Sequence, residues 1–208
     1  MDPQIELLLR RLERERLARK QAEKIVEERS RELFARNEEL KRLSATDPLT
    51  GLHNRRHFGA SARIEFQRAL RFDLKLSAIM MDVDHFKRVN DRFGHAMGDT
   101  VLVEVAGACK AGIRLTDLHA RYGGEEFCFL LPETDLDGAR ILAERLRTAV
   151  SGLPFVTVGE TFTVTASFGV ADRLAGKDSI EDLLERSDKA LYEAKKEGRD
   201  RVVAWKAS

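Results

Sequence analysis

The stretch Arg121-Tyr122-Gly123-Gly124-Glu125-Glu126-Phe127 predicts a strand, a two-glycine turn and a second strand. Glycine adopts positive φ without strain, which tight hairpin turns require. The apolar run 127–131 that follows is typical of a buried strand. Two adjacent carboxylates at a hairpin tip call for a nearby cation, and a divalent metal is the usual one. Taken alone, the stretch is also compatible with a solvated surface turn.

A second apolar run, residues 76–83, predicts a central strand that ends in acidic residues. Asp82 and Asp84 stand at its C-terminal end, and the alternation of side chains along a strand places both on the same face. The end of a central strand is a common ligand site. The strand end and the hairpin tip are therefore the two places where we expect chemistry.

The remaining elements follow from periodicity and turn residues. Asn54 is expected to cap a helix. Residues 94–99 are expected to form a glycine-bounded loop, and Asp99 is expected to cap the helix that follows this loop. Arg114 to Asp117 would close that helix. Helices are expected at about 54–72, 86–91, 101–113, 136–150 and 180–196, and further strands at 118–122, 155–158, 161–170 and 201–204. This order predicts an α/β sandwich with a central, mostly antiparallel sheet flanked by helices.

Composition sets limits on the class of protein. The chain of 208 residues is long enough for one domain with a full core plus an appendage. Its net charge of +1 gives no field that favours nucleic acid or membrane, and it has no apolar run of membrane-spanning length. Cys109 and Cys128 have no metal-binding spacing and are expected to pack as small hydrophobic residues. We therefore expect a soluble, cytoplasmic protein.

Residues 1–46 are expected to form a helical stalk, because this segment contains no glycine and is rich in Glu, Arg, Lys and Leu. A seven-residue register predicts a parallel coiled-coil dimer, although charged residues interrupt its seam. One seam position holds Ile5, Leu12, Arg19, Val26, Leu33 and Leu40, and the other holds Leu8, Glu15, Ala22, Arg29, Arg36 and Leu43. A single surface helix or a disordered charged arm is the alternative.

Four motifs stand in order along the chain: residues 47–56 (DPLTGLHNRR), 82–91 (DVDHFKRVND), 93–99 (FGHAMGD) and 121–127 (RYGGEEF). Together they resemble the GGDEF-type diguanylate cyclases, in the Glu-Glu form of the signature, over about 47–204. The resemblance implies a catalytic domain at 47–208 with a nucleotide-cyclase-like sandwich fold. It also implies that two GTP molecules are joined into cyclic di-GMP, with release of pyrophosphate, at a homodimer interface.

The resemblance assigns metal ligands and catalytic residues at the two acidic positions. Asp82, the Val83 carbonyl and Glu125 match the family's ligands for Mg²⁺ or Mn²⁺, two per active site, and such hard oxygen ligands suit these ions. Glu125 also matches the base for the 3′-hydroxyl, and Glu126 is a second acid beside it. The alternative for Asp82 is a cap at the strand end.

Guanine and phosphate contacts are implied in the same way. Asp99 and Asn90 match the guanine-binding pair, because a carboxylate accepts both the N1–H and the 2-amino group; Asp99 can equally be a helix cap, and His95 is a weak contact in the same loop. The sequence has no Walker-type phosphate loop. The residues that match the family's phosphate contacts are Phe86, Lys87, Lys195 and Arg199, of which the last two can instead complement a helix dipole. Lys87 is also expected to take part in catalysis.

Arg114 and Asp117, together with Arg145, resemble the family's product-binding inhibitory site, with an i,i+3 ion pair as the alternative. An upstream sensor or partner protein is expected to act on the stalk. Three other functions remain open. They are a non-catalytic cyclic di-GMP receptor, a coiled-coil signalling module with an inert domain, and a cyclase that acts on one nucleotide.

Overall fold

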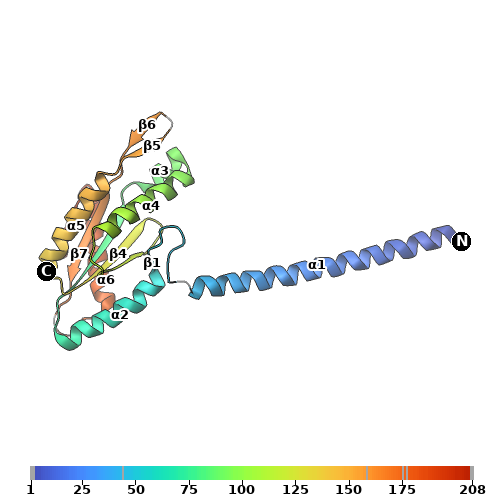
Figure 1. Ribbon diagram of the computed structural model, residues 1–208, viewed down its shortest axis with the longest axis horizontal. Coiled ribbons are helices and arrows are strands. Elements are labelled where there is room, and N and C mark those ends of the chain that lie inside the picture. Colours follow the sequence, from blue (N-terminus) through green and yellow to red (C-terminus); the bar gives the residue numbers. More distant parts are fainter. Residues whose placement is uncertain (1–2, 44, 158, 175, 177, 207–208) are drawn as a thin grey trace. The chain divides into compact units, whose positions relative to one another are not determined.

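The computed structural model describes residues 3–43, 45–157, 159–174, 176 and 178–206. It divides into two compact units, Met1–Ser44 and Ala45–Ser208 (Figure 1). Among the described residues, no helix is both long and apolar enough to cross a membrane.

The first unit is a single helix, α1 (Pro3–Leu43). At 1.5 Å per residue its 41 residues extend roughly 60 Å. Its polar side chains pair along the helix, as Arg19 does with Glu23 and Arg36 with Glu32, while Leu33 is 69% exposed. The side chains of Ile5, Leu8, Leu12, Leu40 and Leu43 lie outside the described residues. Parallel pairing of this helix therefore stays a prediction.

The second unit is built on a six-stranded sheet in the order β1-β3-β4-β2-β7-β8. Its strands are β1 (His53–Asn54), β2 (Leu76–Val83), β3 (Leu118–Arg121), β4 (Glu126–Pro132), β7 (Ala166–Asp172) and β8 (Val202–Ala204). The three central pairings are antiparallel, and the edge pairings β1 with β3 and β7 with β8 are parallel. The sheet is thus mixed, with the expected antiparallel pairs at its centre.

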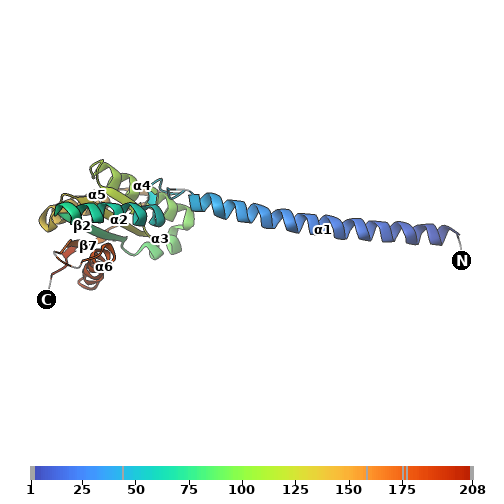
Figure 2. The same cartoon turned by 90° about the horizontal axis from the view of Figure 1, so that it is seen from below.

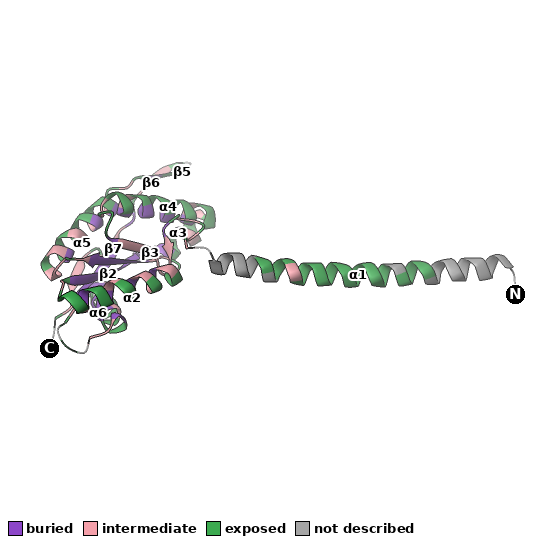
Figure 3. Cartoon of the chain, turned by 60° about the horizontal axis from the view of Figure 1, so that its bottom comes forward, coloured by how far each residue is buried: buried purple, intermediate pink, exposed green. Residues whose placement is uncertain are grey.

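Helices cover both faces of the sheet because β2 and β4 are apolar on both sides, so both faces must be buried. The helices α4 (His95–Ala111) and α5 (Leu136–Ser151) pack on one face, over Ile79, Met81 and Phe129. The helices α2 (Arg55–Phe72) and α6 (Ile180–Lys196) pack on the other, over Ala78 and Met80. Figure 2 shows α4 and α6 on opposite sides, and Figure 3 shows the buried strands between them.

Both cysteines are buried, as expected, and burial raises the pKa of the Cys109 thiol to about 12. At neutral pH this thiol is protonated and packs as an apolar group.

Both boundaries of the helix expected at 101–113 differ from the prediction. The helix α4 begins at His95, because Gly94, at φ 82°, both ends α3 (Phe86–Phe93) and starts α4. Asp99 therefore lies inside α4 and does not cap it, and α4 ends at Ala111, before the segment that was expected to close it.

The strand predicted over 161–170 is two strands. β6 (Glu160–Phe162) pairs with β5 (Phe155–Thr157) in a separate hairpin, and β7 starts only at Ala166. The reason is aromatic packing: Phe162 stacks on Phe93 of α3, with ring centroids 4.3 Å apart, and on Phe155, at 5.4 Å. These contacts hold the hairpin against α3 and away from the main sheet, and the ion pair between Arg92 and Glu160 reinforces them.

Three histidines, from β1, α2 and β3, form a cluster near one edge of the sheet, and they predict acid sensitivity of the fold. The ring centroid of His53 lies 4.4 Å from that of His57 and 6.1 Å from that of His119. Among the described residues, the buried Nδ1 atoms of His53 and His119 have no hydrogen-bond partner. Burial lowers the pKa of both residues, and neighbouring positive charge adds to the effect: His57 acts on His53, and His53 and Lys110 act on His119.

We therefore expect the free energy of unfolding to fall as the pH drops from about 7.5 to about 5.5, since unperturbed histidine has a pKa of about 6.5. As the pH falls through the pKa of the unfolded state, the histidines of the unfolded chain bind protons that the same residues of the folded chain do not bind. The contribution of these histidines to the free energy of unfolding is therefore fully present above the unfolded pKa and is lost below it. When the melting temperature is plotted against pH over this range, the slope should be shallower for the His53→Gln/His119→Gln variant than for wild type. The control is His85→Asn, at an exposed histidine outside the cluster. An equal slope in wild type and double variant would contradict the prediction.

Candidate active site

The hairpin between β3 and β4 brings its acidic residues to the sheet, but its glycines act differently from the prediction. Neither Gly123 nor Gly124 has positive φ. Instead, a Cβ on Gly123 would lie 2.3 Å from Glu126 Oε2, so a larger residue there would displace the Glu126 carboxylate. The turn is closed by bonds from the backbone N–H groups of Tyr122 (2.7 Å) and Gly123 (3.2 Å) to the Glu126 carbonyl.

Arg121 connects the turn of the hairpin to Asp47 through hydrogen bonds. Its Nε and Nη2 donate to the Gly124 carbonyl at 3.1 and 2.8 Å, and its Nη1 lies 3.3 Å from both carboxylate oxygens of Asp47. Burial alone would raise the pKa of Asp47, but hydrogen bonds from Thr50 and the Arg121 guanidinium outweigh it and lower the pKa. The sequence did not predict this contact between Arg121 and Asp47, because the two residues are 74 positions apart, although Asp47 belongs to the DPLTGLHNRR motif and Arg121 to the RYGGEEF motif.

The strand end and the hairpin meet as expected. Asp82 lies opposite Glu126 in the register of β2 and β4, and the Val83 N–H donates to the Glu125 carbonyl at 3.2 Å. Lys195, from the last turn of α6, places its Nζ 2.8 Å from Asp82 Oδ2. Three carboxylates and one ammonium group are thus gathered at one end of the sheet.

Burial and mutual repulsion make these acids a site for positive charge. Burial raises the pKa of Asp82, and Lys195 opposes this only in part. Burial also raises the pKa of Glu125, and the negative charge of Asp82 raises it further. In the described part of the chain no three His, Cys, Asp or Glu side chains form a ready metal cluster. The expected ligand set, two carboxylates and the Val83 carbonyl, requires only two such side chains, and its hard oxygens suit Mg²⁺ or Mn²⁺.

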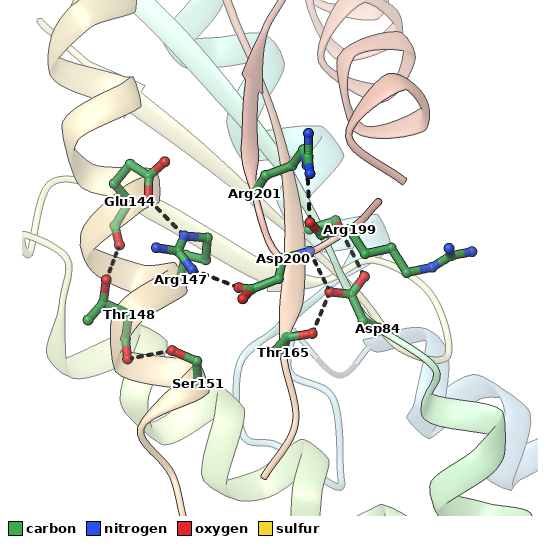
Figure 4. Close-up of polar contacts among 10 residues, drawn as sticks. Asp84, Glu144, Arg147, Thr148, Ser151, Thr165, Arg199, Asp200 and Arg201 are labelled. Atoms are coloured by element: carbon green, nitrogen blue, oxygen red, sulfur yellow. Dashed lines mark hydrogen bonds and ion pairs between the residues drawn. The ribbon is translucent and has the colours of Figure 1, made fainter. Parts of the chain in front are cut away.

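Asp84 has a different environment from Asp82 and acts as a structural anchor. Its carboxylate accepts hydrogen bonds from Thr165 Oγ1 (2.7 Å), Ser167 Oγ (2.7 Å) and the Asp200 N–H (3.0 Å), as Figure 4 shows in part. The residue is 5% exposed. A buried carboxylate with three donors is satisfied within the protein, so Asp84 fixes β7 and the turn after α6 to the end of β2.

Asn90 and the start of α4 come together. A Cβ on Gly98 would lie 2.0 Å from Asn90 Oδ1 and 3.1 Å from the Phe86 ring, so Asn90 packs directly against the residue before Asp99. The Asp99 side chain is exposed on α4. The structure therefore places the amide and the carboxylate of the predicted guanine pair on adjoining helices, α3 and α4.

The other predicted nucleotide contacts lie on α3, on α4 and at the C-terminal end of α6. Lys87 is exposed in the first turn of α3, directly after the end of β2, and His95 is exposed at the first residue of α4. Lys195 contacts Asp82, as described, and Arg199 lies in the turn after α6 with φ 65°.

The three residues of the predicted inhibitory site line one hollow of about 290 Å³. Asp117 is 7% exposed and its Oδ2 accepts from the Arg114 backbone N–H at 2.8 Å, so the two residues form a turn in place of a helix-end ion pair. Arg145 of α5 reaches across to the Gly112 carbonyl. The other residues that line the hollow are Leu131, Thr134, Gly138, Ile141 and Leu142.

The chain is similar to the diguanylate cyclase DgcP of Pseudomonas aeruginosa, with 44% identity over 79% of this chain and 24% of that protein. It is also similar to the solved coiled coil and GGDEF domain of DgcB from Caulobacter crescentus in complex with c-di-GMP. That match has 32% identity, a TM-score of 0.75, and coverage of 91% of this chain and 97% of the other.

A third match is the solved structure of the diguanylate cyclase SiaD of Pseudomonas aeruginosa in complex with its activator SiaC. It has 39% identity and a TM-score of 0.74, and it covers 97% of this chain and 77% of the other. The chain spans about a quarter of the length of DgcP. The family model described as diguanylate cyclase, GGDEF domain, matches residues 44–201. The chain therefore belongs to the GGDEF-domain family of diguanylate cyclases.

Proposed function

We propose that this chain is a diguanylate cyclase that condenses two GTP molecules into cyclic di-GMP and two pyrophosphates. The observation that carries the proposal is the juxtaposition of Asp82 and Glu125, two acids with raised pKa, at the end of a buried strand. Membership of the family and relatives that are themselves named diguanylate cyclases support it.

Asp82, Glu125 and the Val83 carbonyl would hold Mg²⁺ or Mn²⁺, two ions per active site. Bound there, such ions would neutralise the charge of the triphosphate and stabilise the attacking and leaving oxygens. Asp82 and Glu125 suit this role because burial, together with the charge of neighbouring carboxylates, raises the pKa of both acids.

In the proposed reaction Glu125 accepts the proton of the ribose 3′-hydroxyl. The 3′-oxygen forms a bond to the α-phosphorus of the second GTP, and the bond from that phosphorus to the bridging oxygen of the β-phosphate breaks. Lys87 and Arg199 bind phosphate oxygens. Lys195 leaves its contact with Asp82 and binds a phosphate oxygen in its place. Most of the catalysis is therefore positioning and charge neutralisation.

Base selection is assigned to Asp99 and Asn90. The Asp99 carboxylate accepts from the N1–H and 2-amino group of guanine, and adenine has an acceptor at N1 and no 2-amino group. The packing of Asn90 on Gly98 supports this assignment, because it fixes the amide beside the start of α4. His95 is a peripheral contact.

One active site holds one GTP, so the reaction requires two catalytic domains facing each other. We assign this pairing to α1, as a parallel coiled coil. The exposed apolar residues Val26 and Leu33, one heptad apart, support the assignment. Its charged seam positions allow packings of similar energy between which a partner or sensor selects. Sedimentation of the full chain, with a dimer as the expected species, tests the pairing.

The hollow at Arg114 is proposed to bind the product and inhibit the enzyme. The arginine fork matches guanine O6 and N7, and Asp117 matches the N1 edge. We expect Arg114→Ala to weaken cyclic di-GMP binding by about 10- to 100-fold, since one bidentate contact contributes about 1–3 kcal/mol. Calorimetric titration measures this, with the exposed Arg140→Ala on α5 as the control. Equal affinity in wild type and Arg114→Ala would contradict the assignment.

The decisive assay incubates the full chain with GTP and Mg²⁺ and separates the products by chromatography. Cyclic di-GMP supports the proposal. Binding of cyclic di-GMP without turnover would indicate a receptor, and a 3′,5′-cyclic mononucleotide would indicate a different cyclase.

A further inference from the structure

The turn that follows α6 has an unusual backbone. Three successive residues have positive φ: Gly198 at 117°, Arg199 at 65° and Asp200 at 45°. Arginine and aspartate rarely adopt this conformation, and it persists where surrounding contacts hold it. The turn also carries a proposed phosphate-binding residue, so its backbone sets the direction of the Arg199 side chain.

Contacts hold this turn on two sides. On one side the Asp200 N–H donates to Asp84 Oδ2 at 3.0 Å, which fixes the turn to the end of β2. On the other side Asp200 Oδ1 lies 2.7 Å from Arg147 Nη1 of α5 (Figure 4). Arg147 is itself oriented by Glu144 of the same helix, whose Oε2 accepts from its Nε at 2.8 Å.

We propose that Arg147 is a positioning residue for the reaction. It keeps Asp200 in place, and Asp200 keeps the turn in the backbone conformation that presents Arg199 to the substrate phosphates. The inference rests on the proposed function, in which Arg199 contacts phosphate. Arg147 itself touches neither substrate nor metal ligand in this scheme.

The exposure of the pair separates this role from a merely structural one. The side chains of Arg147 and Asp200 are 26% and 42% exposed, and ion pairs of that kind contribute little to global stability. The contact nevertheless joins segments 53 residues apart at a conformationally strained turn. Its loss should therefore alter the geometry of the turn far more than the melting temperature.

The test compares Arg147→Ala with Arg140→Ala in the full chain. Arg140 lies on the same helix and forms an exposed ion pair with Asp137, so its removal controls for the loss of an arginine from α5. We expect Arg147→Ala to raise the KM for GTP by about fivefold or more, with kcat within about twofold of wild type, and Arg147→Lys to restore part of the loss. Arg140→Ala should leave both parameters unchanged.

Calorimetric binding of α,β-methylene-GTP in Mg²⁺ provides a readout that does not need turnover. Its affinity should fall by a similar factor in Arg147→Ala, even if wild type forms no cyclic di-GMP. Unchanged KM and unchanged analogue affinity in Arg147→Ala would overturn the positioning role. A drop in melting temperature large enough to explain the kinetic loss, without rescue by lysine, would overturn it as well. Absence of product from wild type would reject the proposed function and leave the analogue titration to decide this inference.

Discussion

Replacing Glu125 with glutamine should lower the rate of cyclic di-GMP formation by at least about 100-fold, the usual range for loss of a general base. Glutamine is nearly isosteric, but it neither accepts the 3′-hydroxyl proton nor provides a negative charge to a divalent cation. The measurement is product formed per minute from GTP and Mg²⁺, separated by chromatography. Lys189→Gln, at an exposed residue of α6 whose ammonium pairs with Glu185, is a control that also neutralises one charge.

The same substitution should leave the fold intact or slightly more stable. The main-chain contact of Glu125, from the Val83 N–H to its carbonyl, does not depend on the side chain. Because the folded state raises the pKa of Glu125, its ionised form opposes folding at neutral pH, and neutral glutamine removes that opposition. A melting temperature equal to or above that of wild type, together with lost activity, is the expected pair of results. Activity above about a tenth of wild type would contradict the role of Glu125 as base.

The sequence predicted the centre of this fold well, because hydrophobic patterning and burial agree there. The β2 segment is apolar on both faces and carries acids where it ends, so it was recognised as a central strand before any contact was known. The meeting of Asp82 with Glu125 followed from the neighbouring hairpin. The β2 strand and the hairpin are both determined by residues close together in the sequence, and hydrophobic periodicity detects elements of that kind.

The errors arose where a long-range or backbone effect decided the outcome. The helix α4 starts directly after Gly94, which has a φ of 82° and is its N-cap residue. The sequence alone did not reveal this φ, so Asp99 was wrongly predicted to be the helix cap. Gly123 has no positive φ, and its distinguishing feature is its closeness to the Glu126 carboxylate. Asp200 and Arg147 are paired by tertiary structure alone, since each is an ordinary charged residue in its own segment.

A large loss of stability is expected from Gly169→Ala. Gly169 lies in β7, opposite Met80 of β2, at the point where α6 crosses the sheet. A Cβ there would lie 2.1 Å from the Leu191 backbone N and 2.1 Å from the Ser187 carbonyl oxygen. Both atoms belong to the backbone of α6, so no side-chain rotation relieves the clash and the whole helix must move.

Such overpacking should cost about 3 kcal/mol or more of the free energy of unfolding, at the upper end of the usual range, because backbone atoms cannot repack. It should also reduce activity, since displacement of α6 moves Lys195, which lies 2.8 Å from Asp82, away from the proposed phosphate-binding position. Urea unfolding followed by circular dichroism measures the first effect, and the GTP assay measures the second.

The matched control is Gly59→Ala in α2, where a Cβ meets no atom within 4 Å. Alanine is the better helix former by about 1 kcal/mol, so this variant should be as stable as wild type or more so. The opposite signs of the two glycine substitutions separate close helix–sheet packing from general backbone flexibility. Wild-type stability in Gly169→Ala would mean that α6 does not approach β7 this closely, and the placement of Lys195 beside the acids would then lose its structural basis.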